Sequence, residues 1–173
     1  MVWSDQKNSA PLDWVGRYPK GKVQFELQTR DSLSNRFNQI LPLETDGVLS
    51  VDDDIIIPCD SLAASFRVWQ ANKRALVGFS PRMNAFDTTT GHGRYLRWQH
   101  TWWSGLYSII LTKVCFLHKD YLAEYFKVIP DSFLHYIDSH RNCEDLAMAY
   151  VVASKVSELS VRALIMELYL IVS

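Results

Sequence analysis

Short apolar runs alternate with polar stretches along this 173-residue chain, and their length and period predict its strands. Residues 23–28 alternate apolar and polar side chains, and a period of two is typical of a half-buried strand. The runs at 48–51 and 75–79 are apolar, and both are too short for helices, so we expect two buried strands there. A longer apolar run at 107–117 predicts another strand, and residues 1–3 resemble the end of a strand.

Apolar residues at helical spacing predict the helices. Leu62, Phe66 and Trp69 fall on one face, so this helix is expected to lay that face on a sheet, with Asp60 or Ser61 as its cap. Shorter helices are expected over residues 34–40, 120–127 and 132–139, and a further helix opens within residues 141–150.

The same pattern also gives expectations for side-chain orientation, for loops and for the tryptophan-rich stretch. In the helix at 34–40 we expect Phe37 and Ile40 to point inward. Residues 8–21 read as a loop, and residues 80–99 as either a functional loop or an edge hairpin. The tryptophan-rich stretch 98–103 indicates core or hairpin packing, although aromatic faces that stack on sugar rings remain an alternative.

Three consecutive acids follow the strand at 48–51. This strand, the helix after it and the strand at 75–79 form a βαβ-type unit, and ligands of open α/β sheets bind beyond the carboxyl ends of the strands. Asp52, Asp53 and Asp54 occupy that position. Adjacent carboxylates repel one another, and a hard divalent cation is their simplest partner. A solvated acidic turn is the alternative reading.

A second acidic pair, Glu144 and Asp145, lies in the first turn of the helix that Asn142 can cap. The helix dipole favours negative charge there, so we expect both side chains to stay ionised near neutral pH. Capping alone is the ordinary explanation of such a pair.

Composition and charge narrow the class of protein. Apolar residues make up 48% of the chain, which is enough for one folded domain or part of a larger one. The formal net charge of −1 provides no basic surface, so nucleic acid is not an expected partner. The three cysteines show no CxxC spacing, which argues against a structural zinc site. No apolar stretch reaches the roughly 20 residues of a membrane span, and we expect neither an anchor nor a signal peptide in this chain.

Four sequence blocks stand in a familiar order and spacing. They are Val51-Asp52-Asp53-Asp54, Phe66-Arg67-Val68-Trp69, Val77-Gly78-Phe79-Ser80-Pro81-Arg82 and Asn142-Cys143-Glu144-Asp145-Leu146-Ala147. In these blocks the chain resembles the exostosin-like glycosyltransferases, glycosyltransferase family 64, over about residues 2–153, and it looks like a plant-like member. The resemblance implies an α/β fold of the GT-A type, with a mixed sheet flanked by helices, here incomplete.

The resemblance also implies roles for these residues. Asp52, Asp53 and Asp54 match the DxD-type motif that holds a nucleotide-sugar donor on a divalent cation, usually Mn²⁺, with Asp54 as the metal ligand. Arg36 and Glu144 match donor-binding positions. Asp145 matches the catalytic residue of the family, and Asn142 matches a position near the acceptor. Transfer would retain the anomeric configuration, through front-face displacement.

Two further positions are read from the same comparison. Arg82 is expected to bind carboxylates within the sheet, with substrate contact as the alternative. Asp31 stands where relatives have an asparagine that contacts the nucleotide. The implied donor is a UDP-N-acetylhexosamine or GDP-mannose, and the implied acceptor is a glycan or a glycosphingolipid.

After residue 153 the family pattern is lost, so we divide the chain into a partial transferase domain, 1–153, and a divergent apolar tail, 154–173. We expect the chain to be truncated at both ends, to be a poor enzyme alone, and to have a free thiol at Cys143. Family resemblance implies the lumen of the Golgi or endoplasmic reticulum, with a full-length protein anchored in the membrane. The alternatives are a metal-dependent phosphohydrolase and a truncated, non-catalytic isoform that associates with full-length family members.

Overall fold

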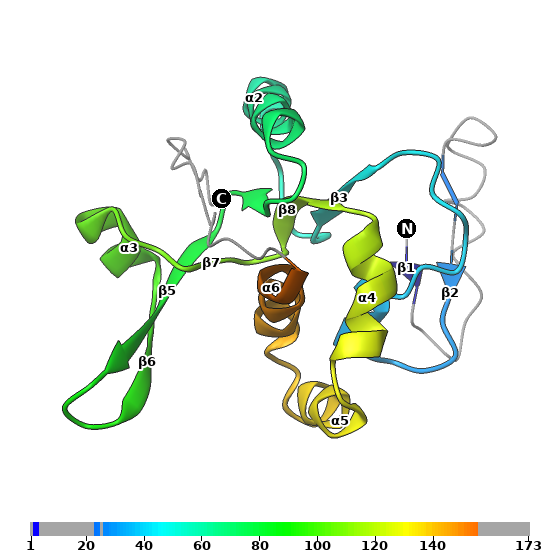
Figure 1. The fold of residues 1–173 in the computed structure, drawn as a ribbon. Helices are drawn as coiled ribbons and strands as arrows, with labels where there is room; N and C mark the ends of the chain where they lie inside the picture. Colours follow the sequence, from blue (N-terminus) through cyan, green and yellow to red (C-terminus); the bar gives the residue numbers. More distant parts are fainter. Residues whose placement is uncertain (1, 4–22, 25, 156–173) are drawn as a thin grey trace.

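The computed structural model describes residues 2–3, 23–24 and 26–155. The expected loop at 8–21 and the tail after residue 155 lie outside these residues. Within them, strands and helices follow one another along the chain, so the predicted α/β class is confirmed (Figure 1). The described strands form one two-stranded and two three-stranded sheets, and the single larger mixed sheet that we expected is not seen among them.

The sheet that positions the acidic motif has the strand order β3-β8-β4. β3 spans Gly47–Val51, β4 spans Val77–Gly78 and β8 spans Val114–His118. Both β3 and β4 pair antiparallel with β8, so these two strands run in the same direction and β8 lies between them. The predicted βαβ-type unit is therefore present as β3, α2 (Cys59–Ala71) and β4. Its two strands are not neighbours in the sheet, because β8, which comes later in the chain, lies between them.

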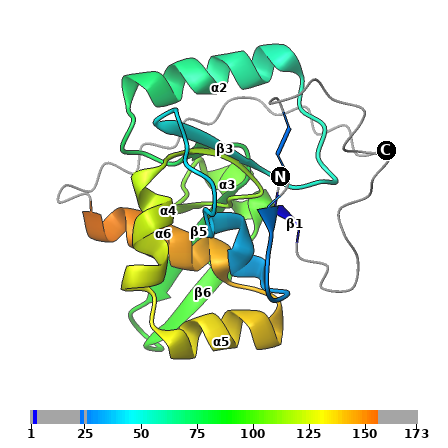
Figure 2. The ribbon, with the colours of Figure 1, turned by 90° about the vertical axis from the view of Figure 1, so that its right-hand side faces the viewer.

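Two hydrophobic layers cover the faces of this sheet, because successive side chains of β8 point to opposite faces. Phe116 packs with Trp69 and Val77 beneath α2. Cys115 and Leu117 point the other way, into the larger core formed with the remaining helices. Figure 2 shows α2 on one side of the sheet and the other helices on the opposite side. Those helices are η1 (Leu33–Phe37), α4 (Asp120–Val128), α5 (Asp131–His140) and α6 (Glu144–Lys155).

A hairpin and a short helix project from this body as an arm (Figure 1). β5 (Pro81–Asp87) pairs with β6 (His92–Leu96), and β7 (Ile109–Ile110) joins the other edge of β5. The helix α3 (Trp98–Ser104) follows the hairpin. Residues 80–99 thus form the edge hairpin that was one of the two sequence expectations. We call residues 81–106 the aromatic arm.

Some details of packing differ from the sequence prediction. Ile40 was expected to point inward, but its side chain is 53% exposed, because the 3-10 helix η1 ends at Phe37 and the chain turns away. Neither Asp60 nor Ser61 caps α2, because the helix begins earlier, and Pro58 precedes it without a side-chain cap. The tryptophans of α3 are exposed, so core packing was the wrong reading of residues 98–103.

The strand predicted at 23–28 is shorter in the structure. β2 spans Glu26–Leu27 and pairs in parallel with β1, Val2–Trp3, which confirms the predicted strand end at residues 1–3. Within the described ranges, no helix has both the length and the apolar character needed to cross a bilayer.

Candidate functional site

The three acids lie in the turn that follows β3, and the backbone fixes the first of them. The Asp52 N–H donates a hydrogen bond of 2.8 Å to the Lys113 carbonyl oxygen, which ties the end of β3 to the loop before β8. Asp52 is partly buried, whereas Asp53 and Asp54 are exposed. The motif therefore presents one acid to the protein and two to solvent.

Arg36 forms an ion pair with Asp52, the partly buried acid of this motif. Ser32 caps η1 by accepting a hydrogen bond from the Ser34 N–H, and Phe37, 1% exposed, packs 4.7 Å from the Tyr125 ring. Because η1 is held at both ends, the guanidinium of Arg36 is directed at Asp52, with which it forms a hydrogen-bonded ion pair.

The same guanidinium also faces α6. Its Nη1 atom lies 3.9 Å from Oε1 of Glu144, and the side chains of Arg36 and Glu144 are 22% and 13% exposed. Arg36 thus connects the acid turn with the acidic start of α6. The sequence comparison assigned Arg36, Asp52 and Glu144 to one donor site, and the fold brings all three together.

Asp145 is anchored by a residue that the sequence reading did not select. Thr112, fully buried between β7 and β8, donates two hydrogen bonds to Oδ1 of Asp145. One comes from its backbone N–H, at 2.6 Å, and the other from its hydroxyl. The sequence did contain a signal that could have identified Thr112. It is the first polar residue after the apolar run at 109–111, just as Asp52 is the first acidic residue after the strand at 48–51.

Burial and neighbouring charges shift the pKa values of two groups at this site. Burial raises the pKa of Glu144, and the neighbouring charge of Asp145 raises it further. This direction is opposite to the one expected from the helix dipole alone. Burial also raises the pKa of the Cys115 thiol, with Asp145 and Asp52 adding to the shift and Arg36 opposing it.

The residues available for a divalent cation are Asp53 and Asp54. No hydrogen bond or ion pair to either carboxylate is found among the described residues, and no group of three or more His, Cys, Asp or Glu side chains there is arranged to hold a metal. Two free carboxylates fit a cation that takes its remaining oxygen ligands from water and a bound diphosphate. They do not fit an all-protein metal site.

The remaining sequence candidates make contacts of their own. Asn142 is exposed just before α6, and its Oδ1 atom accepts the Cys143 N–H at 2.8 Å. All three cysteines are free, as expected for Cys143. Arg82 donates to the neighbouring Pro81 carbonyl, and among the described residues no carboxylate pairs with it. Asp31 forms an exposed ion pair of 3.2 Å with Arg141.

Known proteins resemble this chain over most of its length. A Glycosyl transferase family 64 domain model matches residues 1–169. Glycosylinositol phosphorylceramide mannosyl transferase 1 of Arabidopsis thaliana is 40% identical over 136 residues, which cover 77% of this chain and 41% of the relative. Human Exostosin-2 is 32% identical over 157 residues, covering 89% of this chain and 21% of the relative.

A third relative, human Exostosin-like 2, is 34% identical over 167 residues, which cover 92% of this chain and 50% of the relative. The chain therefore spans half or less of the length of these curated relatives. The family-model match extends over more than half of the chain. This chain belongs to glycosyltransferase family 64.

Proposed function

We propose that this chain carries the donor site of a metal-dependent, retaining glycosyltransferase of the GT-A type. The observation that supports the proposal most directly is the meeting of two acidic segments, at residues 52–54 and 144–145, through Arg36. Family membership supports the sugar-transfer class, and the name of the Arabidopsis relative refers to a mannosyl transferase, so we propose a mannose donor, with GDP as its nucleotide taken from the family resemblance.

In this proposal Asp53 and Asp54 hold a divalent cation such as Mn²⁺ together with the diphosphate of the donor, with Asp54 as the principal ligand. The cation would neutralise charge that develops on the leaving diphosphate. Arg36, fixed by Asp52 and facing Glu144, keeps further N–H groups free to bind the donor, because a guanidinium has five donors.

Asp145 is assigned to the reacting centre. Both hydrogen bonds from Thr112 fall on Oδ1, so among the described residues Oδ2 is left without a hydrogen bond and can face the donor sugar. A fixed carboxylate stabilises positive charge on the sugar ring without reorganising during the reaction. Front-face displacement then needs the acceptor on the same side as the leaving group, where Asn142 precedes α6.

The acceptor in this proposal is a glycolipid. The name of the Arabidopsis relative refers to glycosylinositol phosphorylceramide, and we extend a glycolipid acceptor to this chain from that name. A reaction site in the Golgi or endoplasmic reticulum lumen is likewise proposed from family resemblance.

Thermal unfolding of the chain with Mn²⁺ and either GDP or UDP tests donor binding. At a ligand concentration about 100 times Kd, stabilisation is about 2.7 kcal/mol, which for a chain of this size is roughly 5 °C or more. The shift should require both metal and nucleotide, and should be lost in Asp54→Asn. No shift with either nucleotide would contradict the proposal, and would favour the non-catalytic interaction protein. Donor cleavage that does not depend on a glycolipid acceptor would instead favour a phosphohydrolase.

A further inference from the structure

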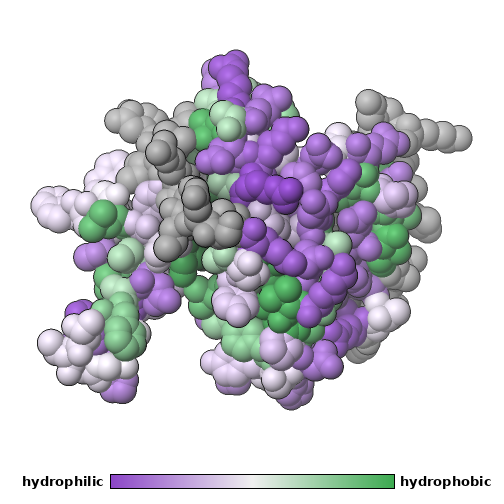
Figure 3. Space-filling model, viewed as in Figure 1, coloured by the Kyte–Doolittle hydropathy of each residue, from purple (hydrophilic) through white to green (hydrophobic). Residues whose placement is uncertain are grey.

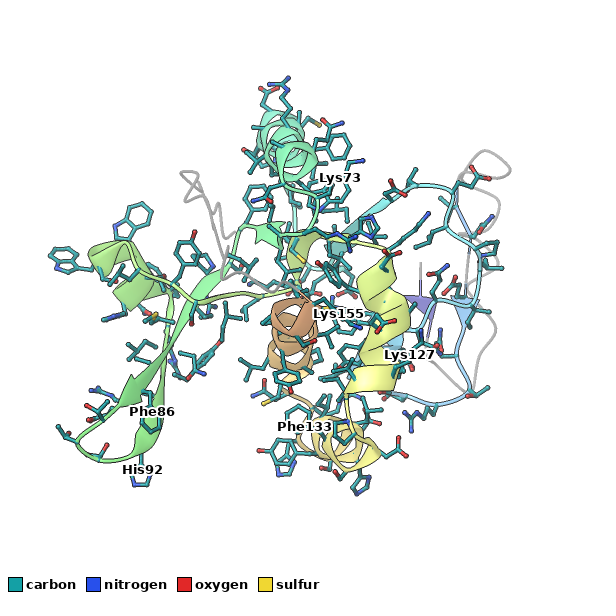
Figure 4. The ribbon with its side chains drawn as sticks, viewed as in Figure 1. Lys73, Phe86, His92, Lys127, Phe133 and Lys155 are labelled. Carbon is teal, nitrogen blue, oxygen red and sulfur yellow. The ribbon has the colours of Figure 1, made fainter. Side chains whose placement is uncertain are left out.

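The aromatic arm exposes large side chains that the donor site does not use. The exposed fractions are 68% for Phe86, 55% for Trp98, 64% for Trp102, 91% for Trp103 and 62% for Leu106. A single exposed aromatic residue is ordinary, but four exposed apolar side chains in and just after α3, with Phe86 toward the hairpin end of the same arm, mark an interaction surface. Figure 3 shows this arm at the left of the view with green and pale residues, and Figure 4 shows Phe86 and His92 at the hairpin end.

The arm is also the basic part of an acidic chain. Residues 81–106 contain three arginines and one aspartate, Asp87. The whole chain has 18 basic and 19 acidic residues, so outside the arm the acidic residues predominate. Arg94 and Arg97 are exposed beside the aromatic residues, while hydrogen bonds from Thr89 and Thr90 satisfy Asp87.

We infer that the aromatic arm docks on an anionic membrane surface, with its tryptophans at the level of the lipid headgroups. Indole rings are amphipathic and prefer the bilayer interface, and arginines beside them are attracted to lipid phosphates. Trp102 and Trp103 are 64% and 91% exposed on a projecting arm, which fits contact with a flat interface. The low overall charge of the chain makes the basic arm the element that would face such a membrane.

A membrane partner agrees with the proposed function, on which this step rests, because an enzyme that modifies a glycolipid must work at a bilayer surface. The base of the arm adjoins the candidate site. Its strand β5 pairs with β7 through Arg82 and Ile109, and Thr112, which holds Asp145, lies two residues after the end of β7. An arm bound to the membrane would therefore hold Asp145 close to headgroups that project from it.

Cosedimentation of the full chain with vesicles tests the arm directly. We expect binding to vesicles of phosphatidylcholine with one part in three phosphatidylserine, and weak binding to phosphatidylcholine alone. The double variant Trp102→Ser/Trp103→Ser should bind at least about tenfold more weakly. Arg94→Gln and Arg97→Gln should each weaken binding about fivefold, and added salt should reduce the arginine effect.

Matched controls lie on α5, where Phe133 and Tyr136 are also exposed, and on α4, at Lys127. Phe133→Ser/Tyr136→Ser and Lys127→Gln should bind vesicles like the unmodified chain. Far-ultraviolet circular dichroism checks that each variant is folded. Equal vesicle binding by the tryptophan variant and the unmodified chain would overturn the inference.

A second copy of this chain is the competing occupant of the arm, since its acidic body could meet the basic arm. Sedimentation equilibrium without vesicles distinguishes the two. A dimer that the tryptophan variant abolishes, together with no binding to anionic vesicles, would assign the arm to self-association and overturn the membrane inference. These vesicles contain neither donor nor acceptor, so a failure here leaves the nucleotide and Mn²⁺ result unaffected.

Discussion

Thr112 holds Asp145 by one oxygen only. Its backbone N–H and its hydroxyl both donate to Oδ1, and α6 carries the carboxylate toward the loop between β7 and β8. A carboxylate restrained in this way keeps its second oxygen directed at a ligand. In the proposed function Thr112 would accordingly be a positioning residue, which acts on the donor sugar through Asp145.

Replacing Thr112 with valine removes one of the two hydrogen bonds and preserves the side-chain volume and the backbone donor. A hydrogen bond to a charged group is worth about 1.5–3 kcal/mol, so we expect kcat to fall roughly tenfold to hundredfold, with KM for the donor little changed. Thr112→Ser keeps the hydroxyl and should retain most activity. Steady-state kinetics with a glycolipid acceptor measures both. A rise in KM alone would contradict a positioning role.

The ion pair of Arg36 with Asp52 should stabilise the fold, in addition to the role of Arg36 in donor binding that we propose. Both side chains are largely buried, so Arg36→Ala leaves a poorly solvated carboxylate and should cost about 1–3 kcal/mol of unfolding free energy. Adding Asp52→Asn to that variant should recover part of the loss, because the unpaired charge is gone. Denaturant unfolding of the two single variants and the double variant measures the coupling.

Arg30 offers the matched control for this cycle. Its contact with Asp138 is 4.0 Å long and its side chain is 58% exposed, so Arg30→Ala should change stability by less than about 1 kcal/mol. If the Arg30 and Arg36 variants lose equal stability, the ion pair with Asp52 has no special role.

Asp53 and Asp54 should behave in the opposite way. Both are exposed, so Asp53→Asn and Asp54→Asn should alter the unfolding free energy of the metal-free chain by no more than about 0.5 kcal/mol. The stabilisation by Mn²⁺ with nucleotide should fall in both variants, and most in Asp54→Asn. Calorimetric titration with Mn²⁺ and GDP checks this difference. Undiminished Mn²⁺ and GDP binding in both variants would show that the acidic turn does not hold the metal.

The raised pKa of Glu144 makes stability depend on pH. A raised pKa in the folded state means that folding favours the protonated form, so this contribution is present below the unfolded-state value near 4.5 and is lost as pH rises through the higher folded-state value. Glu144→Gln should therefore raise the melting temperature at neutral pH while weakening donor binding. The stabilisation should disappear at a pH below 4.5. Melting curves across pH measure it, and a variant less stable than the unmodified chain at neutral pH would show that Arg36 outweighs burial.

Two glycines give a direct test of sheet packing. A Cβ added at Gly78 in β4 would lie 2.4 Å from the Val114 carbonyl oxygen and 2.7 Å from Cβ of Cys115. Gly78→Ala should therefore destabilise the chain by about 1–3 kcal/mol or more. Gly93 in β6 meets only the Asn84 side chain, at 3.9 Å, so Gly93→Ala should be nearly neutral. Thermal melting compares the two, and equal melting temperatures would mean that β4 is not packed against β8 as described.

Local patterns predicted most of the elements that surround the site. The acids after β3, the helix α2 and the acidic first turn of α6 follow from short-range signals, since strand length, apolar spacing and charge position are all local. The β5–β6 hairpin was one of two readings of its segment. Family resemblance then associated Arg36, Glu144 and Asp145 with one ligand.

Other features depend on contacts between distant residues, and local patterns do not contain them. Thr112 and Asp145 are 33 positions apart, and the order β3-β8-β4 needs a strand that begins at Val114. The prediction that the tryptophans of α3 lie in the core was wrong, because their exposure depends on where the β5–β6 hairpin places α3. The roles of Asp54, Asp145 and Asn142, and the Mn²⁺ cofactor, stay predictions.

The insertion of β8 between β3 and β4 has a consequence for biosynthesis. Both outer strands precede β8, and about 40 residues separate the end of β4 from the end of β8. At about 5–20 residues per second, translation leaves the edges of β3 and β4 without their partner for roughly two to eight seconds. Unpaired strand edges invite association with other chains. Assembly of the acidic turn therefore waits for His118 to leave the ribosome, and a nascent chain stalled before that point is a natural client for chaperones.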